Sequence, residues 1–177
     1  FPVVIDEAMK VTSYGSLLKV CKDLLHEKIP IIDMLTIIEA IADIAEFTKA
    51  PEVLLEHVRA KLYRLITQKF KDNDGILHII TIKPELEQQF IGKLQEHHGV
   101  SQLMISIAEI NNLVTKTKTL LDEIEAKGFS KITMVVDPVL RKRISEIYEK
   151  FGLQVSVLSH AELDSRANFA IEGTLEF

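Results

Sequence analysis

Asp137 is the residue best placed for chemistry in this sequence. It follows the apolar run Ile132–Val136 and directly precedes Pro138. Open α/β sheets often hold functional carboxylates at the end of a buried parallel strand, so a small α/β enzyme using Asp137 is one hypothesis. The same pattern is typical of a helix N-cap, because Asp accepts hydrogen bonds from first-turn N–H groups and Pro fits the first helical position. No second acid or Lys converges on Asp137 in the sequence, which favours the cap.

The histidines and the single cysteine form no clear catalytic or metal-binding pattern. His97 and His98 are adjacent, so their rings point in different directions, and a solvated joint is favoured over a metal site. His78 interrupts an apolar strand pattern and is interpreted as a hydrogen-bonded core or interface histidine. Cys21 falls on an apolar helix stripe, where a buried thiol is inert. Neither GxGxxG nor GxxxxGK followed by Ser or Thr occurs, so we predict no catalytic residue, metal or cofactor.

Composition excludes several classes of protein. The chain has 177 residues, 47% of them hydrophobic, and its 21 basic and 26 acidic side chains give a net charge of −5. A chain of this length buries roughly 70% of its unfolded surface, so it forms a real core and is not disordered. The acidic balance argues against broad nucleic-acid binding. No apolar run approaches the roughly 18 residues of a membrane span. A lone Cys fits a reducing compartment. Because the sequence opens with Phe1 rather than Met, we expect a piece of a longer protein.

The first part of the chain is predicted to be helical. Apolar residues recur at spacings of three and four from Tyr14 to Leu25, and Pro30 ends that pattern. A second helix over residues 31–47 is apolar nearly all round, so either its own domain or a neighbouring subunit covers it. A third helix begins near Pro51. The polar cluster at residues 71–75 then ends in Asp-Gly and marks a boundary, dividing the chain into a helical subdomain at 1–75 and an α/β subdomain at 76–177.

The second part alternates strands and helices. Strands are predicted at residues 76–82, 132–136 and 153–158, with helices between them, and the last two strands form a right-handed parallel βαβ unit. A helix is expected from Pro84 to about Glu96. The alternating segment 169–175 predicts a final strand. Its connection, residues 159–167, is shorter than a usual parallel crossover, so we expect this strand to run antiparallel to a neighbour. The predicted fold class is α+β or α/β, with three helices followed by a mixed, partly parallel sheet.

Three runs in the sequence resemble a known family. They are residues 24–43 (LLHEKIPIIDMLTIIEAIAD), 48–66 (TKAPEVLLEHVRAKLYRLI) and 155–163 (VSVLSHAEL). In this order and spacing they are similar to motifs of the FlhA family of flagellar export gates and its injectisome counterparts, the type III secretion export gates. The three runs span most of the chain. The choice between a flagellar and an injectisome gate stays open at this point.

The resemblance implies a fold context and a function. Family members have a membrane half and a cytoplasmic half of four subdomains, and this chain would be the last two. The implied function is non-enzymatic: ring assembly of nine subunits, and docking of export substrates, export chaperones and other export-apparatus proteins. No cofactor is implied. The implied location is the cytoplasmic face of the bacterial inner membrane, with this fragment itself cytoplasmic and soluble.

Five residues are candidate contacts with other subunits or partners. Ile32 stands where the family usually has Arg, next to Asp33, so a contact retained there would be apolar. Arg59 and Arg64 lie five residues apart on the third helix and point to different sides, and one or both could pair with a neighbouring subunit. Arg141 opens a short basic run that could meet an acidic partner, although a solvated helix face is the default interpretation.

Overall fold

The computed structural model describes residues 2–177 and divides into two compact units between Ile66 and Thr67. The division falls inside helix α5 (Tyr63–Phe70), ahead of the polar turn at residues 71–75 that the sequence suggested as the boundary. That turn belongs to the second unit. The N–H of Asp72 donates to the carbonyl of Ile76 (2.9 Å) and so closes the turn immediately before the first strand.

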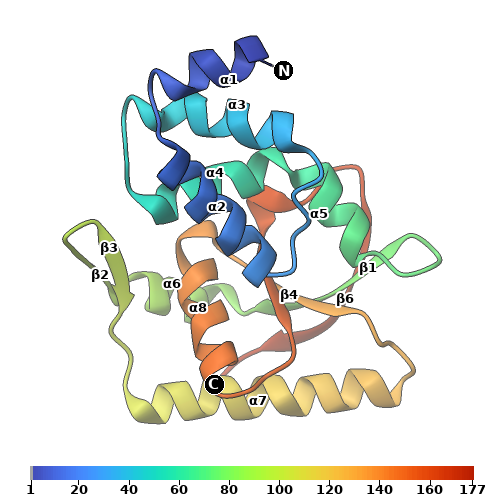
Figure 1. Cartoon of the computed structure of the whole chain (residues 1–177). Coiled ribbons are helices and arrows are strands. Elements are labelled where there is room, and N and C mark those ends of the chain that lie inside the picture. Colours follow the sequence, from blue (N-terminus) through green and yellow to red (C-terminus); the bar gives the residue numbers. More distant parts are fainter. Residues whose placement is uncertain (1) are drawn as a thin grey trace. The chain divides into compact units, whose positions relative to one another are not determined.

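The first unit is built from helices (Figure 1). They are α1 (Pro2–Met9), α2 (Tyr14–His26), α3 (Met34–Ala45), α4 (Pro51–Lys61) and the start of α5. α3 packs against both α1 and α4, and α2 packs against α4. The predicted number of three helices is wrong in two respects. α1 is an additional short helix, and the helix expected from Pro51 onward is divided at Leu62, where the backbone leaves helical geometry (ψ 15°).

Local signals explain where α2 begins and ends. The hydroxyl of Ser13 accepts a hydrogen bond from the N–H of Ser16 (3.1 Å) and satisfies one free donor of the first turn. At the other end Lys28 takes a positive φ of 63°, and the N–H of Ile29 bonds back to the carbonyl of Leu24 (2.8 Å). This left-handed residue terminates the helix in the manner of a Schellman-type ending.

The apolar segment 31–47 is covered mostly by its own unit. Its helix α3 buries five residues against neighbouring helices: Ile37, Ile38, Ala40, Ile41 and Ala45. The two ends differ, because Ile32 is 82% exposed and Phe47 is 85% exposed. Uniform apolarity therefore reflects a core helix in the middle of the segment and uncovered side chains at either end.

The second unit is an α/β fold. Its elements are β1 (Ile76–Ile82), α6 (Pro84–Ile91), β2 (Leu94–His97), β3 (Val100–Leu103), α7 (Ile107–Ala126), β4 (Ile132–Val136), α8 (Pro138–Lys150), β5 (Ser156–Ser159), the 3-10 turn η1 (His160–Glu162) and β6 (Asn168–Leu175). The four-stranded sheet has the order β5-β4-β1-β6, and every neighbouring pair in it is parallel. The predicted α/β class with parallel strands is confirmed.

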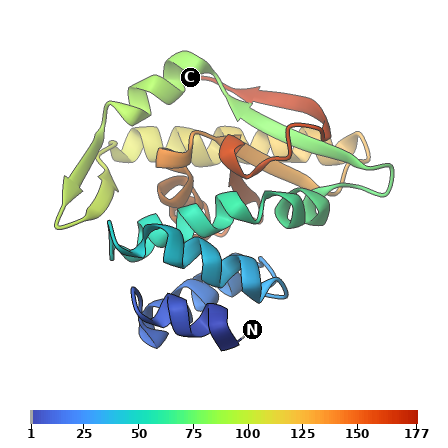
Figure 2. The same ribbon diagram turned by 90° about the horizontal axis from the view of Figure 1, so that it is seen from above.

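The expected antiparallel orientation of the last strand is wrong. β6, an edge strand, pairs with the inner strand β1 in parallel, and the two strands lie side by side in Figure 2. The expectation considered only a conventional crossover between adjacent strands, whereas β5 and β6 lie at opposite edges of the sheet. Nine Cα steps from Ser159 to Asn168 can reach about 30 Å. That length suffices because three strand spacings amount to only about 14 Å and the strands are short.

Helices α7 and α8 cover the sheet and close the main core of this unit. α7 packs against β6, and α8 packs against β4 and β5. The core consists of side chains from strands and helices alike: Ile80, Ile82, Leu86, Phe90, Leu113, Ile124, Met134, Val136, Leu140, Ile144, Tyr148, Val157 and Leu175. The β2–β3 hairpin, whose turn has only two residues, replaces the end of the helix that was expected to reach Glu96. Its tip residues His98 and Gly99 both have positive φ (53° and 77°), as tight hairpins with a right-handed strand twist require.

Candidate functional surfaces and polar clusters

Arg59 forms a buried ion pair inside the first unit. Its Nη1 lies 2.7 Å from Oε2 of Glu27, and the two side chains are 1% and 10% exposed. Glu27 directly follows α2, whereas Arg59 lies on α4, so the pair ties these helices together. Arg59, predicted as a possible contact with another subunit, is thus buried and paired with an acid of its own chain.

Arg141 is also internal. Its Nε lies 3.4 Å from Oε1 of Glu162, and both side chains are 1% exposed. Arg141 shares its helix face with the buried residues Leu140, Ile144 and Tyr148. The solvated helix face expected by default is wrong for Arg141, because its side chain is buried and pairs with Glu162 of η1. Arg141 thus anchors the turn that leads out of β5.

Asp33 has a local role, whereas Ile32 and Arg64 remain on the surface. Asp33 caps α3: its Oδ1 accepts from the N–H of Thr36 (3.2 Å) and its Oδ2 from the Thr36 hydroxyl (2.8 Å). Ile32 next to it is exposed, and the guanidinium of Arg64 lies over the ring of Tyr63 at 5.4 Å. Of the five candidates, Ile32 and Arg64 are the two that keep an accessible side chain without a capping or core role.

The first unit also exposes an apolar face of α2. Its residues are Tyr14, Leu18 and Leu25, which are 70%, 54% and 53% exposed. The sequence pattern predicts that they share one apolar stripe with Cys21 and Leu24. The structure buries only the Cys21 side of that stripe. Burial raises the pKa of the Cys21 thiol, which fits a structural cysteine. Tyr14, Leu18 and Leu25 together make up the α2 face.

Asp137 is a helix cap, as the sequence favoured. Its Oδ1 accepts a hydrogen bond from the N–H of Val139 (3.0 Å), and its own N–H donates to Oε1 of Glu87 (2.7 Å). His160 lies at the same edge, with its Nε2 3.7 Å from Asp137 Oδ2. Glu87 is the second acid that the sequence did not reveal, since it comes from α6, fifty residues earlier. The Asp137 carboxylate is thus occupied in starting α8.

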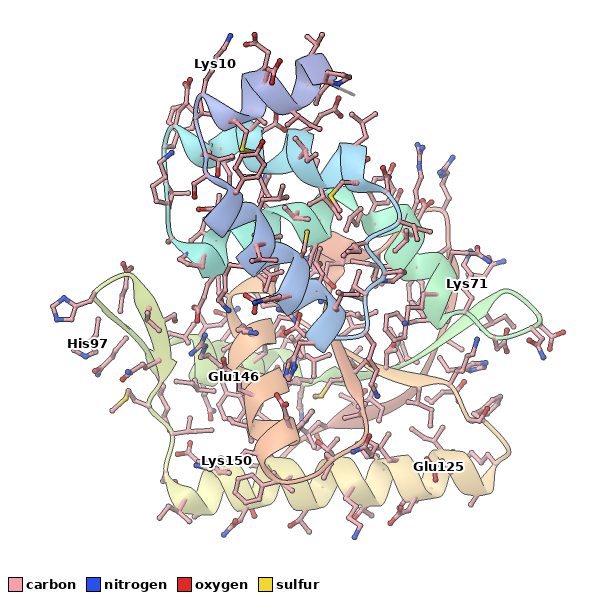
Figure 3. The ribbon with its side chains drawn as sticks, in the orientation of Figure 1. Lys10, Lys71, His97, Glu125, Glu146 and Lys150 are labelled. Atoms are coloured by element: carbon pink, nitrogen blue, oxygen red, sulfur yellow. The ribbon has the colours of Figure 1, made fainter. Side chains whose placement is uncertain are left out.

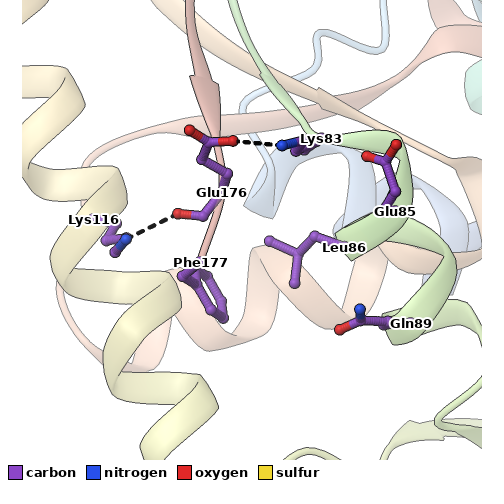
Figure 4. Close-up of a pocket in the computed structure, with 7 residues that line it drawn as sticks. All are labelled: Lys83, Glu85, Leu86, Gln89, Lys116, Glu176 and Phe177. Atoms are coloured by element: carbon purple, nitrogen blue, oxygen red, sulfur yellow. Dashed lines mark hydrogen bonds and ion pairs between the residues drawn. The ribbon is translucent and has the colours of Figure 1, made fainter.

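A shallow pocket lies where β1 and β6 end (Figure 4). Its lining residues are Lys83, Glu85, Leu86, Gln89, Lys116, Glu176 and Phe177. Lys83 pairs with the Glu176 carboxylate (2.9 Å), and Lys116 Nζ donates to the Glu176 backbone carbonyl (3.0 Å). The hydrogen bond between Lys83 and Glu176 raises the pKa of Lys83 and lowers the pKa of Glu176. These cations hold the end of β6 in place, which makes this pocket a structural junction.

His78 is enclosed by two carboxylates from distant parts of the chain. Its Nδ1 lies 2.7 Å from Glu172 Oε1, and its Nε2 lies 2.8 Å from Asp72 Oδ2. The ring is buried (4% exposed) and packs on Phe129, with 4.3 Å between centroids. The interpretation of His78 as a hydrogen-bonded core histidine is confirmed. The sequence signal that marked it, one polar residue within an apolar strand, identified the histidine but gave no indication of Asp72 or Glu172.

The part of the chain that the structure describes contains neither a metal-binding cluster nor a membrane-spanning helix. Across residues 2–177, no group of three or more His, Cys, Asp or Glu side chains is arranged to hold a metal ion. His97 and His98 stand at the tip of the β2–β3 hairpin, where the His97 ring points away from the fold (Figure 3). Within the same described range, the structure contains no helix with the length and apolar content that crossing a membrane requires.

Comparison with known proteins identifies relatives along the whole chain. The sequence profile of the FHIPEP family matches residues 1–168. Flagellar biosynthesis protein FlhA of Helicobacter pylori is 39% identical over 176 residues, which cover 99% of this chain and 24% of the relative. Nonameric EPEC SctV-C has the same fold with a TM-score of 0.87, at 19% identity over 98% of this chain and 52% of that one. A chain in the Chlamydia pneumoniae CdsV and CdsO complex gives 0.84, at 21% identity over 99% and 52%.

These comparisons differ in what they show. The structural likenesses show the fold, and the chain spans about a quarter of the length of the FlhA relatives it matches. The resemblance carried by the three sequence runs is confirmed, because the profile match includes all of them. Together with the Helicobacter pylori identity, the match over residues 1–168 shows that this chain belongs to the FHIPEP family.

Proposed function

We propose that this chain forms the third and fourth cytoplasmic subdomains of a flagellar type III secretion export gate. The observation that carries the proposal is the FHIPEP match along residues 1–168. The division into two compact units supports a pair of subdomains, a helical one followed by an α/β one. In this proposal the parent protein is embedded in the bacterial inner membrane, and these two units lie on its cytoplasmic side.

A flagellar gate is favoured over an injectisome gate. The FlhA relative of Helicobacter pylori is 39% identical to this chain, whereas the SctV-C chain of the same fold is 19% identical. The higher identity extends over almost the whole chain, so it does not depend on one shared motif. Complementation of a motility defect in a flagellar gate deletion strain by the parent gene tests this choice. Restored secretion of an injectisome substrate, without motility, would favour the alternative.

The first unit offers a surface for a second copy of the chain. Ile32 is exposed beside the cap of α3, and the α2 face adds three large apolar side chains on the same unit. Arg64 is an exposed cation on α5 of that unit. Aromatic side chains and Arg are among the residues enriched at subunit interfaces. The nonameric state of SctV-C supports the assignment of a neighbouring copy as the partner.

Charge placed at Ile32 tests the ring proposal. Ile32→Glu in the complete cytoplasmic region puts a carboxylate into the proposed apolar contact, so sedimentation velocity is expected to show a shift from ring to monomer. Val139→Glu is the matched control, because Val139 is an exposed apolar residue of the second unit (52% exposed). An Ile32→Glu protein that assembles as the wild type does would remove Ile32 from the interface. Arg64→Glu extends the test to the charged rim.

Docking of export substrates and chaperones is the second part of the proposed function. The CdsV and CdsO complex supports binding of export-apparatus proteins by a chain of this fold. Calorimetric titration of a flagellar chaperone–substrate complex into the complete cytoplasmic region, and separately into this chain, separates the contributions. We expect the complete region to bind more tightly, because this chain would supply only the last two of its four subdomains. Equal affinity would locate the binding site within residues 1–177.

A further inference from the structure

The cluster around His78 joins four segments of the second unit. Asp72 comes from the turn before β1, His78 from β1, Phe129 from the segment after α7, and Glu172 from β6. Asp72 is itself fastened: its Oδ1 accepts hydrogen bonds from the N–H groups of Asp74 (2.9 Å) and Ile76 (2.8 Å). A single imidazole ring therefore contacts Asp72, 6 positions away in the sequence, and Glu172, 94 positions away.

Glu172 occupies a bulge in β6. Ile79 pairs with Ile171 and Ile80 pairs with Gly173, so Glu172 is an extra residue without a partner on β1. Such a bulge re-aims a side chain and changes the face on which the following residues lie. Before it Phe169 and Ile171 are exposed (both 58%), whereas after it Leu175 is buried. The hydrogen bond from His78 thus holds the one irregular position of an edge strand.

The two ring nitrogens can satisfy both carboxylates only when the imidazole is protonated. An imidazolium has two N–H donors, while neutral imidazole has one N–H and one lone pair. In the neutral form one carboxylate therefore faces a lone pair in a poorly solvated site, which is repulsive. Glu172 is the one expected to leave, because Asp72 stays bound to two backbone N–H groups and Glu172 lies on an edge strand.

We propose that Asp72, His78 and Glu172 form a proton-operated latch, which fastens the β6 bulge to β1 when His78 is protonated and releases it when His78 loses a proton. Two carboxylates act on the ring electrostatically, those of Glu172 and Asp72. Lys131, which follows Phe129, is directed elsewhere and donates to the carbonyl of Lys71 (3.0 Å). The neighbour on β4 is the uncharged Ile132. The latch requires no metal, since its acids lie on opposite sides of the ring.

The direction of the pH effect follows from the titration of the cluster. Burial alone lowers the pKa of His78, but the hydrogen bonds to Glu172 and Asp72 outweigh it, so the pKa of His78 is raised. A raised pKa means that the latch contributes fully below the ordinary histidine value of about 6.5 and is lost as pH rises through the folded-state pKa. For each unit by which the pKa of His78 in the closed latch exceeds its pKa in the open latch, the ratio of open to closed molecules rises by up to about tenfold as pH increases.

Two measurements on this chain test the latch together. NMR titration of the His78 ring gives its pKa. Hydrogen exchange at those β6 amides that donate to β1, corrected for the intrinsic pH dependence, reports opening of β6. We expect the His78 pKa to lie above about 6.5 and β6 opening to increase over the same pH range. Exchange at core positions of α8 is expected to stay constant.

Glu172→Gln supplies the variant and Glu125→Gln the control. The Gln amide retains the size of Glu172 and removes its charge, so the His78 pKa is expected to fall and β6 opening to lose its pH dependence. Glu125 is an exposed acid of α7 (Figure 3), and Glu125→Gln is expected to behave as the wild type. A wild-type His78 pKa at or below the ordinary value, or equal pH profiles for wild type and Glu172→Gln, would overturn the latch. If Glu172→Gln fails to fold, the wild-type titration and exchange still decide.

Discussion

Glu27 and Arg59 lie 32 residues apart in the sequence and form an ion pair of 2.7 Å that is almost closed to solvent. The two residues come from two of the three family motif runs, so the pair connects those runs directly. Arg59 is one of the buried residues of α4, together with Val58, and the residue that ends this helix, Leu62, is also buried. A motif arginine that resembles a surface contact in the sequence is thus part of the internal framework of the first unit.

Removal of the Arg59 guanidinium is expected to destabilise the chain strongly. Arg59→Ala removes the cation that lies 2.7 Å from the poorly solvated Glu27 carboxylate, a change that costs about 3 kcal/mol or more. Urea unfolding followed by far-ultraviolet circular dichroism measures the difference. Arg64→Ala is the matched control, because Arg64 is exposed and its loss is expected to change the unfolding free energy by less than about 0.5 kcal/mol. Similar values for both variants would contradict an internal role for Arg59.

Asp137 is expected to act through stability rather than through chemistry. Asp137→Ala removes the acceptor for the Val139 N–H at the start of α8, and loss of a cap costs about 1 kcal/mol. Asp137→Ser is expected to recover most of that loss, since a hydroxyl oxygen also caps a helix. Thermal unfolding of the three proteins checks the order. An Asp137→Ala protein as stable as the wild type would reopen the enzyme hypothesis.

The hydroxyl of Tyr148 is expected to matter although it is remote from every surface. It contacts the Thr117 hydroxyl (2.7 Å) and the Met134 sulfur (2.9 Å), and burial raises its pKa far above the ordinary tyrosine value. Tyr148→Phe leaves the buried Thr117 hydroxyl without this partner, which costs about 1–3 kcal/mol. The double variant Tyr148→Phe with Thr117→Val is expected to be more stable than Tyr148→Phe alone. The unfolding free energies in urea establish whether that rescue occurs.

The capping box at the start of α7 predicts a pH effect in the acid range. Ser106 and Glu109 bond to each other's backbone N–H groups, and Lys93 pairs with Glu109. Lys93, followed by the Ser106 groups, lowers the pKa of Glu109 to about 2. A lowered pKa contributes stability above the unfolded value of 4.5, and this contribution is lost as pH falls toward 2. Glu109→Gln is therefore expected to be less stable than wild type at pH 7, with a difference that shrinks below pH 4.5.

Much of the fold could be predicted because it depends on local patterns. The strand at 132–136 has the predicted bounds, and the helix starting at 107 follows its apolar stripe to its end near Gly128. The β2–β3 hairpin was missed because Leu94 to Leu103 is short and polar, so its alternation is weak. The direction of β6 could not be predicted from the short connection 159–167, because that connection does not join neighbouring strands. The strand that β6 pairs with, β1, lies more than eighty residues earlier in the sequence.

The polar sites were harder to predict than the fold. Arginine is usually a surface residue, so the sequence predicts that Arg59 and Arg141 are exposed. Only the tertiary structure shows that Glu27 and Glu162 pair with them in the interior. The cap at Asp137 was predictable, since its acceptor and donor lie two residues apart. The His78 cluster was only half predictable, because Glu172 enters it through a bulge that alternation along residues 169–175 conceals.

The parallel pairing of β1 with β6 has a consequence for the order in which the second unit assembles during synthesis. β1 is central in the sheet, and one of its edges stays without a hydrogen-bonded neighbour until residues 168–175 have left the ribosome. The helices of the first unit form mostly through contacts between neighbours in sequence, which are quick to make, whereas this pairing closes a long loop and is slow. The nascent chain therefore carries an apolar strand with an unpaired edge until β6 has been synthesised, and unpaired strand edges make a folding intermediate prone to aggregate.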